Sequence, residues 1–318
     1  MNQLMNNAEI EALISSNLLP KNYQEGIRRY LIPLAQSICQ HHEQFYKGKT
    51  WYIGLQGTQG SGKSTTAEFL RALIEQYPLS VTLVSIDDFY LTHQERTELS
   101  ESVHPLLKTR GVPGTHDVQL AMDTLTGLSQ EKITNVPHFD KAMDDRSSKT
   151  YWEKVHGAVD IVIFEGWCVG LPAQSDSELK TDVNELEAKE DTDHQWRQYV
   201  NEKLASEYQA LYALLEDLIV LQAPDFDCVY EWRLLQEEKL KKAAIAESRS
   251  LDRIQSPEQI KRFISHYQRL TEHGLQNLKD YARWILKLNN QHEFTELVDQ
   301  KPKKVLGQSQ QEKGGEHE

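Results

Sequence analysis

Short runs of consecutive apolar residues recur along the chain, separated by longer stretches in which apolar residues return every three or four positions. The short runs predict strands, and because the runs near residues 84 and 162 hardly alternate with polar residues, they are typical of parallel strands buried on both faces. We predict strands at residues 51–55, 81–86, 133–139, 159–164, 217–221 and 284–288.

The stretches between these runs have the spacing of amphipathic helices. Between residues 7 and 45, Ile27, Leu31, Leu34 and Ile38 recur on one helical face, and Pro20 is expected to open the second helix of this segment. Further helices are predicted at 66–75, 118–128, 196–215, 225–246 and 260–278. Strands that alternate with helices indicate an α/β fold built on a doubly wound parallel sheet, with N-terminal and C-terminal helical additions.

The composition along the chain predicts three segments. We predict an N-terminal helical segment over 1–48 that packs on the core, a main domain over 49–300, and a disordered tail over 301–318 because the tail has little to bury. The acidic stretch 173–194 is predicted to be a surface loop or flexible excursion.

The first predicted strand runs into Gly57-x4-Gly62-Lys63-Ser64, and a helix follows. This is the strand, loop and helix order of a phosphate-binding loop, and it predicts a P-loop NTPase fold. Glycines let the backbone curl so that several N–H groups face one polyphosphate, while the lysine reaches the outer phosphates and the serine hydroxyl suits Mg2+. The expected nucleotide-binding residues are Gly57, Thr58, Gln59, Gly60, Ser61, Gly62, Lys63, Ser64 and Thr65.

Acidic residues follow two of the predicted strands. Asp87 and Asp88 come directly after the strand at 81–86, and Glu165 follows the strand at 159–164. Ligands of open parallel sheets lie beyond the carboxyl ends of the strands, so these acids should lie near the outer phosphate of a bound nucleotide. One acid of the pair could accept a proton from a substrate hydroxyl, and Glu165 could face Mg2+ together with Ser64.

Four basic side chains are candidates for anion contacts. Arg110 and Arg146 lie in loops rich in Gly, Pro and Asp, and either could bind a carboxylate or the transferred phosphoryl group. His138 is a candidate donor to the substrate, or else a histidine of a turn or the core. Arg233 is a candidate phosphate contact, or else a surface cation paired with Glu237 four residues on.

The net charge and the cysteines limit the kinds of partner and of bound metal that we expect. The formal net charge is −13, which repels nucleic acid and favours a small metabolite. The three cysteines are far apart, which suggests neither a zinc site nor a disulfide framework. Without a targeting or membrane-spanning segment in the sequence, we expect a cytoplasmic protein with no membrane partner, either a monomer or a homodimer.

Several segments together resemble a known family. The loop at 57–65 and Ser85-Ile86-Asp87-Asp88-Phe89-Tyr90 resemble the P-loop superfamily of uridine kinase, pantothenate kinase and phosphoribulokinase. The segments His104–Asp117, Pro137–Arg146 and Phe164–Gly170 narrow the resemblance to the D-glycerate 3-kinase family of the plant type, which has fungal and bacterial relatives.

The resemblance implies a fold, a reaction and roles for the site residues. It implies ATP and Mg2+ as cofactors, D-glycerate as the acceptor and 3-phosphoglycerate as the product. It also implies that Asp87 rather than Asp88 is the base, that the loop around Arg146 closes over the acceptor, and that a lid helix near 225–246 brings Arg233 to the phosphates. Lys63 would hold the polyphosphate.

Other functions are compatible with the same motifs. The acceptor could be a nucleoside or a pantothenate-like molecule, and the chain could instead be a regulatory module that binds and hydrolyses NTP without phosphorylating an acceptor. Phosphorylation of nucleic-acid ends is disfavoured by the charge of −13.

Overall fold

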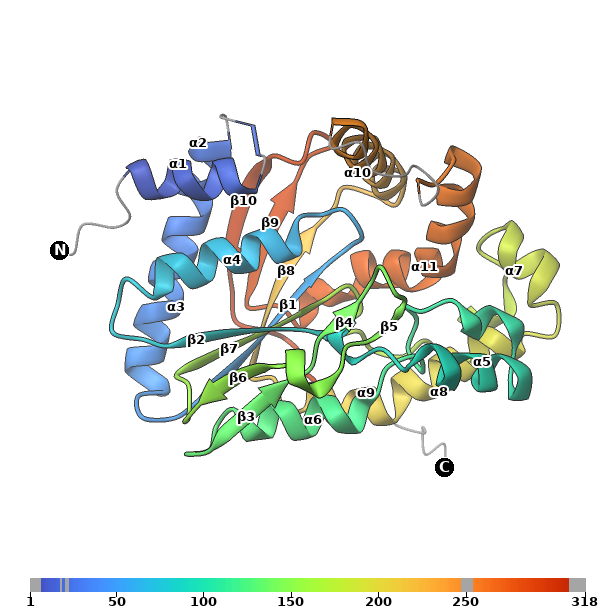
Figure 1. The fold of residues 1–318 in the computed structure, drawn as a ribbon, viewed down its shortest axis with the longest axis horizontal. Helices are drawn as coiled ribbons and strands as arrows, with labels where there is room; N and C mark the ends of the chain where they lie inside the picture. The colour runs from blue at the N-terminus through green and yellow to red at the C-terminus, as the bar shows by residue number, and fades with distance from the viewer. Residues whose placement is uncertain (1–6, 18, 21–22, 247–253, 309–318) are drawn as a thin grey trace, which may run out of the picture.

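The computed structural model describes residues 7–17, 19–20, 23–246 and 254–308, and its centre is a six-stranded sheet. The strand order is β10-β9-β8-β1-β7-β2, and every pair is parallel except β9 with β10 (Figure 1). The strands are β1 Trp51–Gly57, β2 Val81–Ser85, β7 Ile161–Gly166, β8 Asp217–Gln222, β9 Trp284–Leu288 and β10 Phe294–Asp299. The predicted α/β fold is therefore confirmed.

Two small antiparallel sheets stand apart from the main sheet. The predicted strand at 133–139 forms β3 Ile133–Val136, which pairs with β6 Glu153–His156, and β4 Phe139–Asp140, which pairs with β5 Asp145–Arg146. The expected single strand is interrupted because residues 137–138 leave the first pairing before the second begins. The β4–β5 hairpin therefore projects beside the carboxyl ends of the main strands (Figure 1).

Helices cover both faces of the main sheet. The α-helices are α1 Asn7–Ser16, α2 Tyr23–Gly26, α3 Ile32–Phe45, α4 Lys63–Ile74, α5 His93–Ser102, α6 Val118–Gly127, α7 Glu185–Glu190, α8 Gln195–Ala205, α9 Glu207–Tyr212, α10 Asp227–Ala246 and α11 Pro257–Asn277. A π-helical turn, Ile27–Leu31, joins α2 to α3, and short 3-10 turns span Ile86–Phe89, Pro105–Lys108, Lys149–Tyr151, Glu178–Lys180 and Leu278–Asp280. Asp117 caps α6 by accepting a hydrogen bond from Leu120 N–H.

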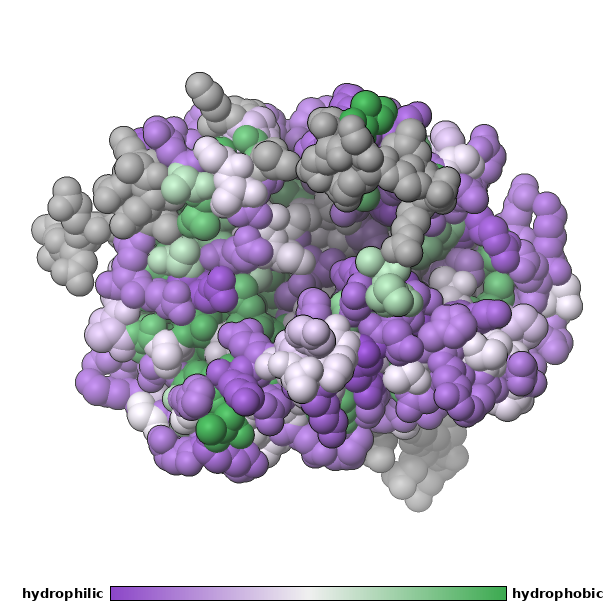
Figure 2. Space-filling view, viewed as in Figure 1, coloured by the Kyte–Doolittle hydropathy of each residue, from purple (hydrophilic) through white to green (hydrophobic). Residues whose placement is uncertain are grey.

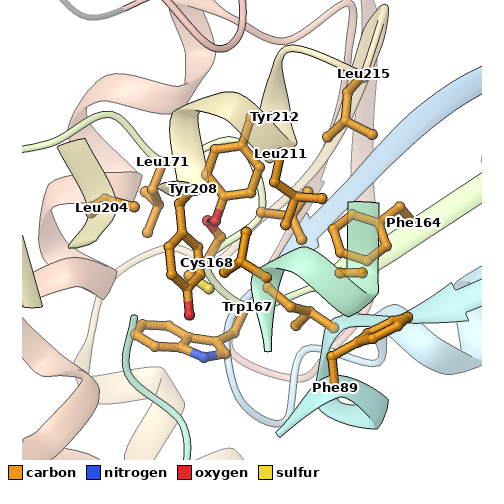
Figure 3. Packing of buried hydrophobic residues seen from close by; sticks show 14 of the residues in the cluster. Phe89, Phe164, Trp167, Cys168, Leu171, Leu204, Tyr208, Leu211, Tyr212 and Leu215 are labelled. Atoms are coloured by element: carbon orange, nitrogen blue, oxygen red, sulfur yellow. Dashed lines mark hydrogen bonds between the residues drawn. The ribbon is translucent and has the colours of Figure 1, made fainter. Parts of the chain in front are cut away.

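The sheet separates two hydrophobic cores. Alternate residues of one strand enter opposite cores: Ile161 and Ile163 face α3 and α4, whereas Val162 and Phe164 face α6, α9 and α11. In the second core, Tyr208 and Tyr212 pack around Cys168, and the Tyr212 hydroxyl donates to the Cys168 carbonyl at 2.6 Å (Figure 3). Burial of both strand faces explains why the apolar runs are continuous.

Strand β10 was not predicted. It has one buried residue, Phe294, and its other residues are exposed or half-buried, because it is the edge strand of the sheet. A sequence search for apolar runs therefore passes over it.

The structure describes most of the predicted N-terminal segment and the first residues of the predicted tail. Residues of α3 join the core of α4, and Leu306 is buried in the opposite core. Residues 309–318 of the predicted tail lie outside the described residues. No helix in the described part of the chain is long and apolar enough to cross a membrane.

The prediction that residues 173–194 form a surface loop or flexible excursion was wrong for its second half. Helix α7 brings Glu187 and Asp191 into the interior, where both side chains are almost fully buried. Asp191 accepts from Arg197 Nε at 2.7 Å, and Glu187 accepts from Arg269 Nε at 2.7 Å. Acidic residues are buried here because two arginines, on α8 and α11, neutralise them.

Replacing Arg197 with Met should destabilise the fold strongly. The substitution leaves Asp191 buried without its guanidinium partner, and breaking one side of a buried ion pair costs about 3–5 kcal/mol. Urea unfolding of Arg197→Met against wild type measures this cost. The matched control is Arg262→Met, which removes an exposed pair with Glu190 and should cost about 1 kcal/mol or less. Equal losses in the two variants would show that the buried network does not stabilise the fold.

Asp217 makes stability depend on pH. It starts β8 and is buried, with Arg283 Nη1 3.6 Å away, and burial raises its pKa to about 6 despite the opposing charge of Arg283. The folded protein therefore holds this proton at pH values where the unfolded chain has lost it. Stability should fall as pH rises from about 4 to about 6, and the penalty stays fully present above that window.

Asp217→Asn should remove this penalty. Relative to wild type, the free energy of unfolding of the variant should improve by about 1–3 kcal/mol between pH 4 and pH 7, because the pKa differs by about two units. Urea melts at several pH values test this, with the exposed Asp123→Asn as the control. A difference between Asp217→Asn and wild type that does not change with pH would contradict the assignment.

Candidate active site

The phosphate-binding loop joins the carboxyl end of β1 to the start of α4. Gly60 and Gly62 have φ values of 76° and 84°, a left-handed conformation that glycine adopts without strain. Gly57 is required for a different reason: a Cβ there would lie 2.5 Å from Ser61 Oγ. The three glycines thus close the loop tightly enough for its N–H groups to converge.

The inner surface of the loop carries polar oxygens that the fold does not pair. Among the described residues, the side-chain oxygens of Thr58, Gln59 and Ser61 are buried without a hydrogen-bond partner. Lys63, Ser64 and Thr65 form the first turn of α4, where helix N–H groups lack intrahelical partners. Helix N–H groups without partners, the Thr58 and Ser61 hydroxyls, which can donate, and a lysine together favour an anion such as a polyphosphate.

The β9–β10 turn supports the loop from outside. His292 Nε2 donates to the Gly60 carbonyl at 2.6 Å, since a carbonyl only accepts, and its ring stacks on Trp232 with centroids 4.1 Å apart. A Cβ on Gly60 would lie 3.0 Å from Trp232 Cβ, so the first turns of α10 lie against the loop. His292 and Trp232 were not among the predicted site residues, because their contacts join segments far apart in sequence.

Ser64 and Glu165 meet at the centre of the site. Ser64 Oγ donates to Glu165 Oε1 at 2.7 Å, and the other carboxylate oxygen, Oε2, is buried with no hydrogen-bond partner in the described part of the chain. Glu165 is aligned in register with Leu55 of β1 and with Ser85 of β2. The parallel sheet therefore brings the acid of β7 to the loop.

Asp87 lies at the carboxyl end of β2 with both carboxylate oxygens hydrogen-bonded. Oδ2 accepts from Lys141 Nζ at 2.8 Å, and Oδ1 accepts from the Tyr90 hydroxyl at 2.8 Å. Burial favours the neutral acid, but the charges of Lys141 and Lys63 outweigh it and hold the pKa of Asp87 well below its usual range. Asp87 is therefore an ionised carboxylate close to the lysine of the phosphate loop.

Asp88 contacts residues of the β4–β5 hairpin rather than the phosphate loop. Its Oδ1 accepts from Phe139 N–H at 3.0 Å and lies 3.2 Å from His138 Nδ1. Burial raises the pKa of Asp88 in spite of these contacts. Asp88 thus anchors the β4–β5 hairpin, and the exposed His138 lies on the outer side of this anchor.

The three predicted arginines all contact acidic side chains of the protein itself. Arg110 pairs with Asp144 and lies over the ring of Phe139, 5.5 Å from its centroid. Arg146 Nη2 donates to the Tyr90 carbonyl at 3.0 Å, and Nη1 lies 3.3 Å from Asp117.

Arg233 adopts the arrangement given as the alternative to a phosphate contact, because it pairs with Glu237 at 2.6 Å. Its side chain is only 16% exposed, so it is not a surface cation. Its backbone N–H lies beside Gly60, 3.6 Å from where a Cβ would be. The backbone of Arg233 therefore lies next to the phosphate loop.

Tyr267 of α11 is buried, and the charges of Asp87, Arg110 and Arg233 act on it. Burial raises the pKa of its phenol and the charge of Asp87 adds to this, whereas Arg110 and Arg233 lower it. The buried Tyr267 hydroxyl donates to the Arg110 carbonyl at 3.0 Å. Ser64 is hydrogen-bonded to Glu165, and the charge of Lys63 acts on Asp87. The molecular face between the loop and the β4–β5 hairpin is hollowed (Figure 2).

Among known proteins, several kinases are similar to this chain. No family model matches the chain. An uncharacterised kinase of Schizosaccharomyces pombe is 34% identical over 237 residues, which is 70% of this chain and 79% of that protein. The chloroplastic D-glycerate 3-kinase of Arabidopsis thaliana is 29% identical over 257 residues, 75% of this chain, and the match spans 52% of the plant protein.

A solved structure resembles the whole fold. The D-glycerate 3-kinase of Cryptococcus neoformans superposes with a TM-score of 0.70 at 26% identity, covering 85% of this chain and 98% of the fungal one.

Proposed function

The chain belongs to the D-glycerate 3-kinase family of P-loop kinases, and we propose that it phosphorylates D-glycerate at the 3-hydroxyl, using ATP and releasing ADP. It is a phosphotransferase that acts on an alcohol group of a small molecule. We propose D-glycerate as the acceptor, and we propose the roles of the individual residues that follow.

One observation carries the proposed chemistry: the Asp87 carboxylate accepts from Lys141 Nζ at 2.8 Å, and the charges of Lys141 and Lys63 hold its pKa well below its usual range. In the transfer, the acceptor oxygen forms a bond to the γ-phosphorus while the bond from that phosphorus to the bridging oxygen breaks. ADP leaves with the electron pair, and Asp87 takes the proton of the acceptor hydroxyl. Lys63 holds the polyphosphate in line.

Ser64 and Glu165 fit the requirements of Mg2+. Their oxygens are hard ligands that already lie 2.7 Å apart, and the free Oε2 of Glu165 is buried and aimed away from any protein partner that the described residues provide. When bound, Mg2+ would neutralise charge on the phosphate oxygens. Glu165 would hold it, directly or through water, and Ser64 would orient it.

The acceptor is proposed to be a hydroxy acid because the acceptor side is rich in cations. Arg110, 30% exposed, is the arginine best placed to meet a substrate carboxylate, and Asp144 shows that its guanidinium binds a carboxylate. Arg146 would position the hairpin rather than touch the substrate, and the exposed His138 would line the entrance. Arg233 would reach the phosphates only after leaving Glu237.

A kinase assay over a panel of acceptors tests the proposal. ADP release is measured with hydroxy acids, nucleosides and pantothenate, and Lys63→Ala prepared in the same way corrects for contaminating kinases. D-glycerate should give the highest kcat/KM of the panel. A nucleoside or pantothenate that exceeds D-glycerate by about tenfold, 1.4 kcal/mol of transition-state binding, would replace it as the acceptor.

A further inference from the structure

We propose, on the premise of the kinase activity above, that Lys141 is a second lysine of the active site, which donates to the transferred γ-phosphoryl group while Asp87 accepts the proton of the acceptor hydroxyl. Lys141 lies in the segment Pro137–Arg146, which carries the resemblance to the family. Its position in the structure gives it a specific contact.

Lys141 begins the turn of the β4–β5 hairpin and reaches back to Asp87. Its Nζ lies 2.8 Å from Asp87 Oδ2, and its charge also interacts with Glu165. The charge of Lys63, at the start of α4, acts on the same carboxylate. A γ-phosphoryl group held by Lys63 near Asp87 would therefore lie within the reach of Lys141 as well.

The base needs a free oxygen for the acceptor hydroxyl, and the structure indicates which partner gives way. Tyr90 is buried and held by rings, with His116 stacked at 4.5 Å and Phe139 edge-on at 5.2 Å. Lys141, by contrast, is 60% exposed on a flexible four-carbon side chain. Lys141 is thus the contact that can move from Asp87 to a phosphoryl oxygen.

The hairpin that carries Lys141 is fixed to the body of the protein. Asp88 accepts from Phe139 N–H on β4, and Arg96 donates to the Asp144 carbonyl at 2.8 Å and pairs with its carboxylate at 3.0 Å. The backbone of the turn is therefore held on both sides. Lys141 can change partners by side-chain rotation alone, because its three N–H donors suit either oxygen anion.

Charge balance supports the transfer of this contact. The carboxylates of Asp87, Glu165 and Asp88 all act on the charge of Lys141, and Asp87 interacts with Lys63 as well, so three acids face two lysines before the nucleotide arrives. A nucleotide that adds more negative charge needs every nearby cation, and a lysine at the transferred group opposes the repulsion between phosphoryl group and base. The proton taken by Asp87 then passes to solvent.

The variants Lys141→Met and Lys141→Arg test the inference, with Lys154→Met on the exposed strand β6 as the control. Lys141→Met should lower kcat by about 100-fold while the Kd for ATP, measured by calorimetry, changes by less than about threefold. Lys141→Arg should recover at least about tenfold of the loss, because it restores the charge. Lys154→Met should behave like wild type.

The pH profile adds a readout that a structural role would not change. Removing the positive charge of Lys141 should let the pKa of Asp87 rise, so the acid limb of kcat/KM moves to higher pH in Lys141→Met. A kcat within about threefold of wild type, or an unmoved acid limb, would overturn the inference alone. A wild-type protein that phosphorylates no acceptor would overturn it together with the proposed function.

Discussion

Lys63→Ala is expected to abolish turnover, with kcat lower by on the order of a thousandfold or more. Lys63 is the first residue of α4 and the cation that we propose holds the polyphosphate, and its charge also helps to hold the pKa of Asp87 below its usual range. Truncation therefore removes a transition-state contact and weakens the field that keeps the base ionised. Steady-state ADP release measures the loss.

The fold of Lys63→Ala should remain intact. The side chain is only half-buried, so the free energy of unfolding should change by no more than about 1 kcal/mol. Lys132→Ala, an exposed lysine beside β3, is the matched control and should keep wild-type activity. A Lys63→Ala protein that is folded and fully active would remove the assignment of the phosphate loop.

Asp87→Asn should lower kcat by about a thousandfold, because an amide cannot accept the proton of the acceptor hydroxyl. The Kd for ATP should stay near the wild-type value, since the proposed role of Asp87 is to contact the acceptor hydroxyl. Asp88→Asn is the closest control: its side-chain oxygen can still accept from Phe139 N–H, so kcat should fall by less than about tenfold. A larger loss in Asp88→Asn than in Asp87→Asn would reverse the assignment of the base.

The phosphate loop and the carboxylates near it could be predicted because their constraints are local. Glycine spacing defines the loop wherever it occurs, and the lysine and serine that follow are fixed by the first turn of α4. Asp87 and Glu165 come together since parallel strands all end at the same edge of the sheet. Sequence order alone thus carries the geometry of these four residues.

The arginines could not be placed in this way. Whether Arg146 faces a substrate or Asp117 depends on how the β5 strand packs against the start of α6, and residues far apart in the chain decide it. The same holds for Glu187 and Asp191, whose acidic segment has the composition of an exposed loop until Arg197 and Arg269 are brought to it. Charge patterns along a chain do not reveal which charges pair across it.

For Lys141, the sequence indicates a functional loop but not the contact that its side chain makes. It lies in a segment that resembles the family, Pro137–Arg146, yet only the folding of the β4–β5 hairpin directs its side chain to Asp87. A sequence can mark such a loop as functional, whereas the residue that performs the function depends on the turn. The edge strand β10 was passed over for a related reason, because its partner is needed to define it.

The central claim is that the loop delivers the γ-phosphoryl group to an alcohol rather than to water, and phosphorus NMR tests it most directly. Wild-type protein is incubated with ATP, Mg2+ and D-glycerate, and the phosphorus products are counted as ATP disappears. The account predicts ADP and a phosphate monoester on the 3-hydroxyl in equal amounts. Inorganic phosphate in place of the monoester would contradict it.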